Sequence, residues 1–497
     1  MRTLSRPGVV LALAWLAVAA VLIARAGKYP AVMTGDEIWF SESAFNFLRH
    51  GIPQRLIHDD AVGSARADFL PPVIMLVQAL GFALLGLTPL AVALQSILAP
   101  LGAIALITAI ARRAGATLGW AGAAGIALLG SQIFLRAGLY IRYEALVAVF
   151  FLLYLLATRL ADAQARAWPW QLVRGAALAL AGLSYYPLAP FAGIAALAFE
   201  IGRPFTRARV LPTLLGFALP ALAFAAYVAR FPDIFAAQII GNGESNYVTF
   251  ELLAHPFDPA LWRQSKDAIP ELIGLAALLV ILIARWRRER PWVRRLTVAL
   301  VITCPPILIF PFQPRLLALP VTLALLVLAA WTTQTAPTIR RIGRAALVAG
   351  LLAAGASASL MLATSWLQRD ARDYGAVEAA LDRLIRQPGA AAIDQRAWLA
   401  LRAADPTREL DHAMPHWAAA QVRIFESRVL RDPAGGEHFR YVVLPTADAD
   451  ATIAATPALA TAFAAGKFVE IGRIALPFTP LPWATQAPYD LTVYERR

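Results

Sequence analysis

The chain has 497 residues, of which 59% are hydrophobic and only 15% charged, and its mean hydropathy is +0.60. Soluble globular proteins carry about 45–50% apolar and about 25% charged residues. The composition therefore excludes a water-soluble protein with a single core and also a disordered chain. It predicts a polytopic α-helical membrane protein with a soluble appendage.

The net charge of +13 comes mostly from arginine. The arginines stand in short clusters between apolar runs and not in a basic patch interleaved with aromatic residues, so we interpret them as topology signals and expect no nucleic acid partner. The single cysteine, Cys304, lies in an apolar run. One cysteine excludes a disulfide framework and a cysteine-based metal site.

The N-terminus combines Arg2 and Arg6 with an apolar run at 9–23 and the sequence Ala-Arg-Ala at 24–26. This pattern resembles a signal peptide with its cleavage site. Because many more spans follow, we predict an uncleaved signal anchor with a cytoplasmic N-terminus. The chain after residue 26 then lies outside the cytoplasm.

Apolar runs predict the remaining membrane helices, several of them shorter than the usual 17–25 residues. We expect 71–86, opened by Pro71 and Pro72, to lie along the interface or re-enter. We expect 172–199 to form two short spans broken near Pro187. The predicted topology has eleven spans and an external C-terminus. The spans are 9–23, 90–111, 117–135, 145–158, 172–186, 187–199, 210–229, 269–284, 296–311, 315–331 and 345–363.

Charge asymmetry supports this topology. The loops assigned to the cytoplasm hold 17 arginines and two acidic residues, whereas the external segments 26–89, 136–144 and 230–268 hold 9 basic and 12 acidic residues. Cytoplasmic loops of membrane proteins carry such an excess of basic residues. If 71–86 crossed the membrane, the arginine clusters after it would all lie outside.

We divide the chain into a membrane module at 1–363, with external loops at 26–89 and 230–268, and a tail at 364–497. Charges occur throughout the tail. We expect an amphipathic helix near 371–386 and strands at 441–444, 468–471 and 491–494. The tail is thus predicted to be a small external α/β domain. For the whole chain we expect the bacterial inner membrane, with this domain in the periplasm.

Ionisable residues gather at the external ends of the spans and are nearly absent from their middles. A transporter is expected to place them near the membrane midplane. Asp36 and Glu37 open a predicted helix at 37–49. One interpretation is that Asp36 or Thr34 caps this helix. The alternative is that Asp36 is a general base just above the membrane.

Two later segments repeat this placement. Arg142 and Glu144 stand at the external end of a span, where they either anchor it or line a site. Arg315 lies in a tight external turn, Phe-Pro-Phe-Gln-Pro-Arg. It either anchors the interface or binds a lipid phosphate, since a guanidinium pairs bidentately with phosphate oxygens.

Together these motifs resemble the GT-C superfamily of membrane glycosyltransferases, in particular the branch of protein O-mannosyltransferases and lipid A aminoarabinose transferases. The resemblance covers about residues 1–365 and rests on Gly35-Asp36-Glu37, Pro71-Pro72 and the external arginines. That family commonly has Lys or His before the two prolines, where this chain has Leu70. Nearby Arg66 is the candidate substitute, and we include Asp68 beside it as a binding residue.

The resemblance implies a glycosyltransferase that moves a hexosyl or pentosyl group from a polyprenyl phosphate to an acceptor hydroxyl at the outer face. It makes Asp36 the catalytic base and Glu37 its neighbour. Arg142 and Glu144 would line the cavity and Arg315 would contact the donor phosphate. A single displacement predicts inversion at the anomeric carbon. The partners are then the donor, membrane lipids and a lipid, glycan or protein acceptor.

No cofactor is assigned. A divalent metal assists some members of the superfamily, but we find no ligand set here and name no metal residues. Two other classes stay open, namely a transporter or flippase of lipid-linked sugars and a membrane assembly protein whose tail recruits partners.

The topology is tested by labelling Arg112→Cys in a Cys304→Ala background. We expect a membrane-impermeant maleimide to modify residue 112 only after the cytoplasmic side is opened, because the Arg112–Arg113 pair belongs to a cytoplasmic loop. Labelling of intact cells from the periplasmic side would overturn the topology. A cysteine placed at Lys28 provides the opposite control.

Overall fold

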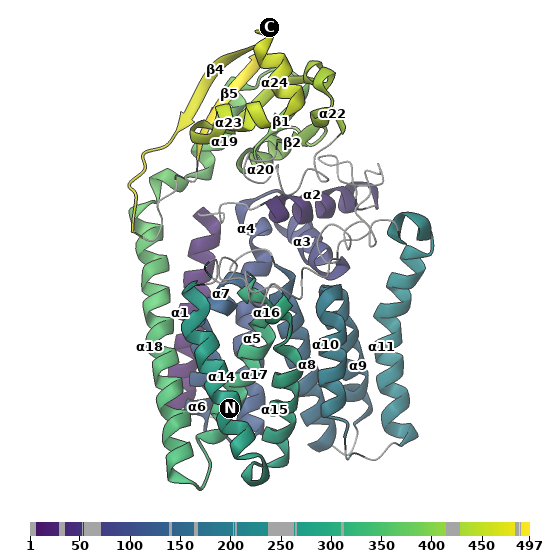
Figure 1. Ribbon diagram of the computed structural model, residues 1–497, viewed down its shortest axis with the longest axis vertical. Coiled ribbons are helices and arrows are strands. Elements are labelled where there is room, and N and C mark those ends of the chain that lie inside the picture. The colour runs from purple at the N-terminus through teal and green to yellow at the C-terminus, as the bar shows by residue number, and fades with distance from the viewer. Residues whose placement is uncertain are drawn as a thin grey trace.

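The computed structural model shows a bundle of helices with a small sheet at one end (Figure 1). The C-terminus lies in the part of the molecule that holds the sheet. The residues that the structure describes are 6–28, 35–51, 53, 71–138, 142–163, 167–201, 203, 206–236, 263, 266–309, 313–413, 428–482, 487 and 489–497.

A helix overlaps each of the eleven ranges that were expected to cross. In the described part of the chain, six helices are long and apolar enough to span a membrane, or seven if one bent pair forms a single span. The protein is thus multi-pass, and the total of eleven stays a prediction. The eleven helices are α1 (Arg6–Lys28), α5 (Leu94–Arg113), α6 (Leu118–Ala127), α8 (Tyr143–Ala163), α9 (Trp168–Ser184), α10 (Ala189–Ala198), α11 (Arg207–Val228), α14 (Ile269–Ala284), α15 (Pro291–Thr303), α17 (Ala318–Trp331) and α18 (Pro337–Leu367).

The long helices divide into a central and a peripheral set. In the most apolar window of each helix, 61% of the residues are buried in α5, 72% in α8 and 83% in the span that contains α17, against 6% in α1 and α11 and 17% in α18. Apolar side chains that face outward over a whole helix are stable in lipid and not in water. Helices α5, α8 and α17 therefore form the centre of the bundle, and their N-terminal ends lead to the candidate site.

The expected span at 117–135 is bent in the structure. It is not one straight helix, because α6 ends in a short 3₁₀ turn at Leu128–Gly130 and α7 (Gln132–Gly138) leaves at 75°. Ser131 explains the break. Its backbone is extended and its Oγ accepts a hydrogen bond from the Phe134 N–H at 3.0 Å, so it caps a new helix.

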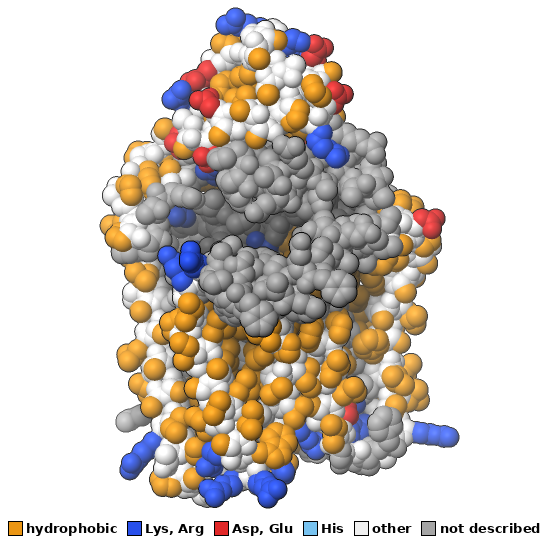
Figure 2. Space-filling model, viewed as in Figure 1, with side chains coloured by type: hydrophobic (Ala, Val, Ile, Leu, Met, Phe, Trp, Pro, Cys, Tyr) orange, Lys and Arg blue, Asp and Glu red, His pale blue; other side chains and the backbone are white. Residues whose placement is uncertain are grey.

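The arginine-rich loops meet at the end of the bundle farthest from the sheet, where Figure 2 shows Lys and Arg side chains projecting. Five of the loops assigned to the cytoplasm are 112–116, 161–170, 201–209, 285–295 and 332–344. Contacts between residues in or beside these loops join them in series. These contacts are Arg344 over the Trp120 ring at 5.5 Å, Arg290 Nη2 donating to the Thr333 carbonyl at 3.5 Å, Arg295 Nη2 donating to the Ile201 carbonyl at 3.1 Å, and the Arg203–Asp162 ion pair. The loops therefore share one end, as expected, and their cytoplasmic location stays a prediction.

Two helices lie at the other end, between the bundle and the sheet. Helix α2 (Gly35–His50) runs across the ends of the bundle helices, and α3 (Pro72–Leu85) packs beneath it (Figure 1). Ser41 Oγ donates to Gln78 Oε1 at 2.7 Å, and Gln78 Nε2 donates to the Val92 carbonyl at 2.9 Å in α4 (Pro89–Val92). The Pro-Pro helix and the helix after Gly35 are both present, and buried polar bonds hold them together.

The tail forms a five-stranded mixed sheet in the order β2-β1-β3-β5-β4. The strands are β1 (Ala390–Ile393), β2 (Leu410–His412), β3 (Phe439–Pro445), β4 (Phe468–Ala475) and β5 (Asp490–Arg496). β1 pairs in parallel with β2 and β3, while β5 pairs antiparallel with β3 and β4. Helices α19 (Tyr374–Leu384) and α20 (Gln395–Ala404) flank β1 in sequence.

The three predicted strands and the helix near 371–386 are confirmed. The sequence analysis missed β1 and β2, which are only four and three residues long. Strand β1 reads Ala-Ala-Ala-Ile and β2 reads Leu-Asp-His, so neither has the β-branched alternation that signals a strand. Pairing with neighbouring strands, β1 with β3 and β2 with β1, and not local preference makes them strands.

Candidate active site

An ion pair joins two distant segments at the sheet end of the bundle. Arg315 Nε donates to Glu144 Oε1 at 2.7 Å, although the residues are 171 positions apart. The Glu144 side chain is fully buried and the Arg315 side chain is 23% exposed. One edge of the guanidinium is thus committed to the protein, and the Arg315 side chain as a whole is partly exposed.

Local structure explains both positions. Glu144 lies in the first turn of α8, where the positive end of the helix dipole favours a carboxylate. Arg315 lies in the 3₁₀ turn Pro314–Leu317 that opens α17, and its Nη2 also donates to Gln313 Oε1 at 3.3 Å. The turn that the sequence marked with two prolines therefore aims Arg315 at the start of another helix.

Arg142 stands beside this pair. Its backbone carbonyl accepts a hydrogen bond from Gln95 Nε2 of α5. Burial lowers the pKa of Arg142 from its ordinary value, and the Arg315 guanidinium lowers it further, so the two cations lie near each other. Arg142, Arg315 and Glu144 together carry a net charge of +1, which suits an anion.

Aromatic rings connect this cluster to α2. Tyr143 stacks on Tyr185 with ring centroids 3.9 Å apart and an interplanar angle of 19°. The edge of the Phe40 ring meets Tyr143 at 5.7 Å. Such pairs stabilise a fixed arrangement beyond the area that they bury. They hold the start of α8 against α2, one helical turn after Asp36.

The predicted site residues are placed as follows. Glu144 and Arg315 are in direct contact, and Arg142 adjoins them. Asp36 and Glu37 lie in the first turn of α2, and their side chains fall outside the described part of the structure. Arg66, Asp68 and most of the loop at 230–268 also lie outside it.

Some residues around the site were not predicted. Tyr143, Tyr185, Gln95 and Gln313 position the charged groups. Gln95 carried a usable signal, since a glutamine in an apolar helix needs a buried partner. The aromatic residues carried none, because tyrosine is frequent at the ends of all membrane helices.

A metal site finds no support among the described residues, where no group of three His, Cys, Asp or Glu side chains is placed to hold an ion. We therefore derive no step through a metal.

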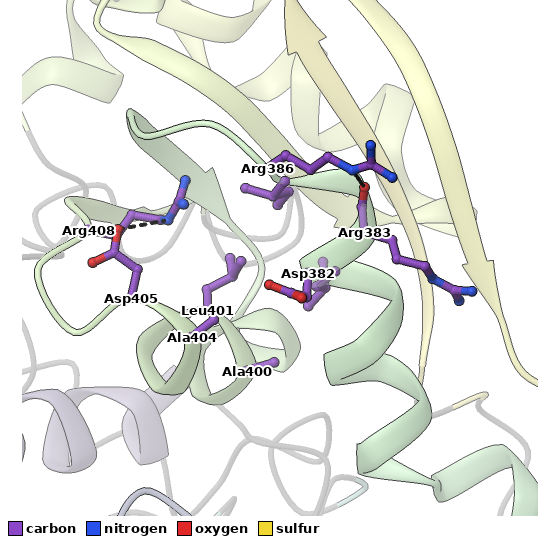
Figure 3. A pocket seen from close by; sticks show the side chains of 10 residues that line it. Asp382, Arg383, Arg386, Ala400, Leu401, Ala404, Asp405 and Arg408 are labelled. Atoms are coloured by element: carbon purple, nitrogen blue, oxygen red, sulfur yellow. Dashed lines mark hydrogen bonds and ion pairs between the residues drawn. The ribbon is translucent and has the colours of Figure 1, made fainter.

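A separate pocket of about 520 Å³ lies in the tail, between α19 and α20 (Figure 3). Arg408 pairs there with Asp405 at 3.7 Å, and Arg386 Nε donates to the Arg383 carbonyl at 2.9 Å. Its lining contains none of the predicted site residues. We therefore place the candidate site at the α2, α8 and α17 ends and not in this pocket.

No family model and no curated protein matches the sequence. Solved structures do match. The structure of ArnT from Cupriavidus metallidurans bound to undecaprenyl phosphate has a TM-score of 0.59 at 14% identity, and the match covers 99% of this chain and 98% of that one. The same protein in the apo state has a TM-score of 0.58 at 14% identity, covering 97% of each chain.

The arabinofuranosyltransferase AftD from Mycobacteria is a more distant match. Its TM-score is 0.51 at 14% identity, and the match covers 99% of this chain but 42% of AftD. Identity at this level shows the fold and nothing finer. The chain has the fold of the GT-C glycosyltransferases, and the resemblance that the sequence suggested is confirmed at that level.

A double-mutant cycle tests the ion pair. Arg315→Ala leaves the buried Glu144 carboxylate without its cation. This loss should lower the free energy of unfolding by about 1–3 kcal/mol or more. The double variant Arg315→Ala/Glu144→Ala removes both charges and should be more stable than Arg315→Ala alone. Thermal unfolding in detergent micelles measures both effects.

An exposed pair in the tail supplies the control. Lys467 and Glu437 have side chains 41% and 68% exposed, so Lys467→Ala should change stability by only about 0–1 kcal/mol. Simple additivity of the two substitutions at Arg315 and Glu144 would show that the two side chains do not interact.

Proposed function

We propose that this protein is a glycosyltransferase that transfers a sugar from a polyprenyl-phosphate donor to an acceptor hydroxyl at the outer face of the membrane. One observation carries the proposal. A partly exposed arginine, fixed by a buried carboxylate, lies at the sheet end of a bundle that shares its fold with ArnT, whose structure holds undecaprenyl phosphate. We expect the same class of ligand here.

Arg315 has the donors that a phosphate needs. Its Nε donates to Glu144 and one N–H of Nη2 donates to Gln313, which leaves Nη1 and the second N–H of Nη2 for a ligand. Two parallel N–H donors match two phosphate oxygens. Glu144 fixes the plane of the guanidinium before the donor binds, so little ordering remains to be done during the reaction.

The leaving group requires this cation. When the bond between the anomeric carbon and the phosphate oxygen breaks, the polyprenyl phosphate keeps the electron pair and gains negative charge. A fixed guanidinium in a site with little water stabilises this second, developing charge more than the singly charged phosphodiester of the ground state. Arg142, which lies near Arg315, adds positive potential at the same place.

The acceptor requires a base. As the acceptor oxygen attacks the anomeric carbon, its proton passes to the carboxylate of Asp36, which lies one turn before Phe40 on α2. The attack occurs opposite the departing phosphate, so the anomeric configuration inverts. Glu37, next in the helix, keeps the local potential negative and helps Asp36 to accept the proton.

The substitution Asp36→Asn tests the base. Asparagine retains the size and most of the capping ability of aspartate but cannot accept the proton. We expect a folded, inserted protein whose transfer of labelled sugar from a polyprenyl phosphate falls by about 10²-fold or more. Purified protein in detergent is the material to assay.

The control is a second aspartate whose role is to cap a helix. Asp373 Oδ1 accepts hydrogen bonds from the Gly375 and Ala376 N–H groups at the start of α19. Asp373→Asn should leave transfer unchanged. Near-wild-type transfer by Asp36→Asn would reject Asp36 as the base. Transport of a lipid-linked sugar without transfer, in both the wild-type protein and Asp36→Asn, would favour a flippase.

Arg315 is tested by comparing two substitutions. Arg315→Ala should lower transfer by about 10²-fold or more, as expected when a donor that stabilises the leaving group is lost. Arg315→Lys should be milder, because the charge remains while the bidentate geometry is lost. Arg287, an exposed arginine at the opposite end of the bundle, serves as the control with the same two substitutions. Equal activity of all four variants would refute a phosphate-binding role.

A further inference from the structure

A second buried ion pair connects the tail to α2. Arg402 of α20 donates from Nη2 to Glu42 Oε1 at 2.6 Å and from Nε to Glu42 Oε2 at 3.3 Å. The Trp398 indole N–H also donates to Glu42 Oε2. The side chains of Glu42 and Arg402 are 1% and 0% exposed. Two charges so completely removed from water hold one geometry, because any separation leaves a bare ion.

The rest of the Arg402 guanidinium is also satisfied. Its Nη1 donates to the Arg408 carbonyl at 2.7 Å and to the Pro406 carbonyl at 3.2 Å. The same Pro406 carbonyl accepts from Arg49 Nη1 of α2 at 2.7 Å. The loop after α20 is thereby bonded to both Arg402 and Arg49, and α2 is bound to the tail at two points along its length, Glu42 and Arg49.

Packing around the pair leaves little room for sliding. The guanidinium groups of Arg402 and Arg49 lie over the Phe45 ring, at 5.3 Å and 5.5 Å from its centroid. The Trp398 ring meets Phe82 of α3 at 6.4 Å. Helix α20 is therefore seated on α2 and α3 together, on the side of α2 that faces the sheet (Figure 1).

We propose that Arg402 and Trp398 of the tail are positioning residues, which fix α2 and through it the start of that helix, where Asp36 lies. This inference rests on the proposed function. Asp36 and Glu42 share one helix and are separated by about 9 Å along its axis, at a rise of about 1.5 Å per residue. A helix moves as a rod over that length, so the setting of Glu42 determines the setting of Asp36.

The site needs such support from the tail. Below α2, the Phe40–Tyr143 contact and the Ser41–Gln78 hydrogen bond hold the helix against the bundle. Neither contact carries charge. The buried ion pair with Arg402 lies on the opposite side of α2 and adds a charged contact from the tail.

The test uses full-length Arg402→Lys and Glu42→Gln, because lysine keeps the charge and glutamine keeps the shape. We expect the turnover number for sugar transfer to fall by about 10-fold or more, as for a small misplacement of a catalytic group. The KM for the polyprenyl-phosphate sugar should stay within about twofold, since Arg315 binds the donor. Both values refer to the folded fraction, measured well below the midpoint of thermal unfolding.

A combination with Asp36→Asn separates positioning from general stability. If Arg402 acts through Asp36, then Arg402→Lys should change the residual turnover of Asp36→Asn by less than about twofold. A merely structural role predicts the same 10-fold loss in both backgrounds. Equal losses, or an unchanged turnover number in Arg402→Lys, would overturn the positioning role.

The matched control is Arg473→Lys with Glu470→Gln. This Arg–Glu pair lies in the same tail at 2.8 Å, but its side chains are 58% and 39% exposed and it does not contact α2 among the described residues. Both variants should be silent. The two proposals fail separately: full activity of Asp36→Asn removes the catalytic role of Asp36, whereas an inactive Asp36→Asn beside a normal Arg402→Lys removes only the inference about the tail.

Discussion

A neighbouring cation stabilises a carboxylate that is taken out of water, and two such pairs join distant parts of this molecule. Glu144 and Glu42 are both completely or almost completely buried, and each lies against an arginine from a distant part of the chain. Each pair therefore fixes two segments relative to each other. Hydrophobic packing alone would leave helices freer to slide, because lipid and protein are similarly apolar.

The two pairs differ in what they leave open. Glu42 and Arg402 are closed on every side, so their contact joins elements and offers nothing to a ligand. Arg315 is partly exposed while its partner Glu144 is buried. An arginine held in this way is rigid and still accessible, which is the condition for electrostatic stabilisation of a leaving group. The contrast separates the candidate catalytic contact from the positioning one.

The opposite end of the bundle uses the same chemistry for another purpose. Glu200 lies among Arg174, Arg203 and Arg209, and the Tyr154 hydroxyl donates to it at 3.0 Å. The sequence analysis interprets Arg203 and Arg209 as topology signals, and the structure shows that both also join helix ends through Glu200.

The sequence by itself determined the membrane class, the clustering of arginines at one end, three of the five strands, and which residue types belong to the site. These features depend on composition and on local periodicity, which a single chain displays directly. It did not determine partners. The Arg402–Glu42 contact spans 360 positions and the Arg315–Glu144 contact spans 171, and no local pattern encodes such distances. The bend before α7 and the short strands β1 and β2 were decided by tertiary structure as well, because a capping serine and a neighbouring strand outweigh weak local preference.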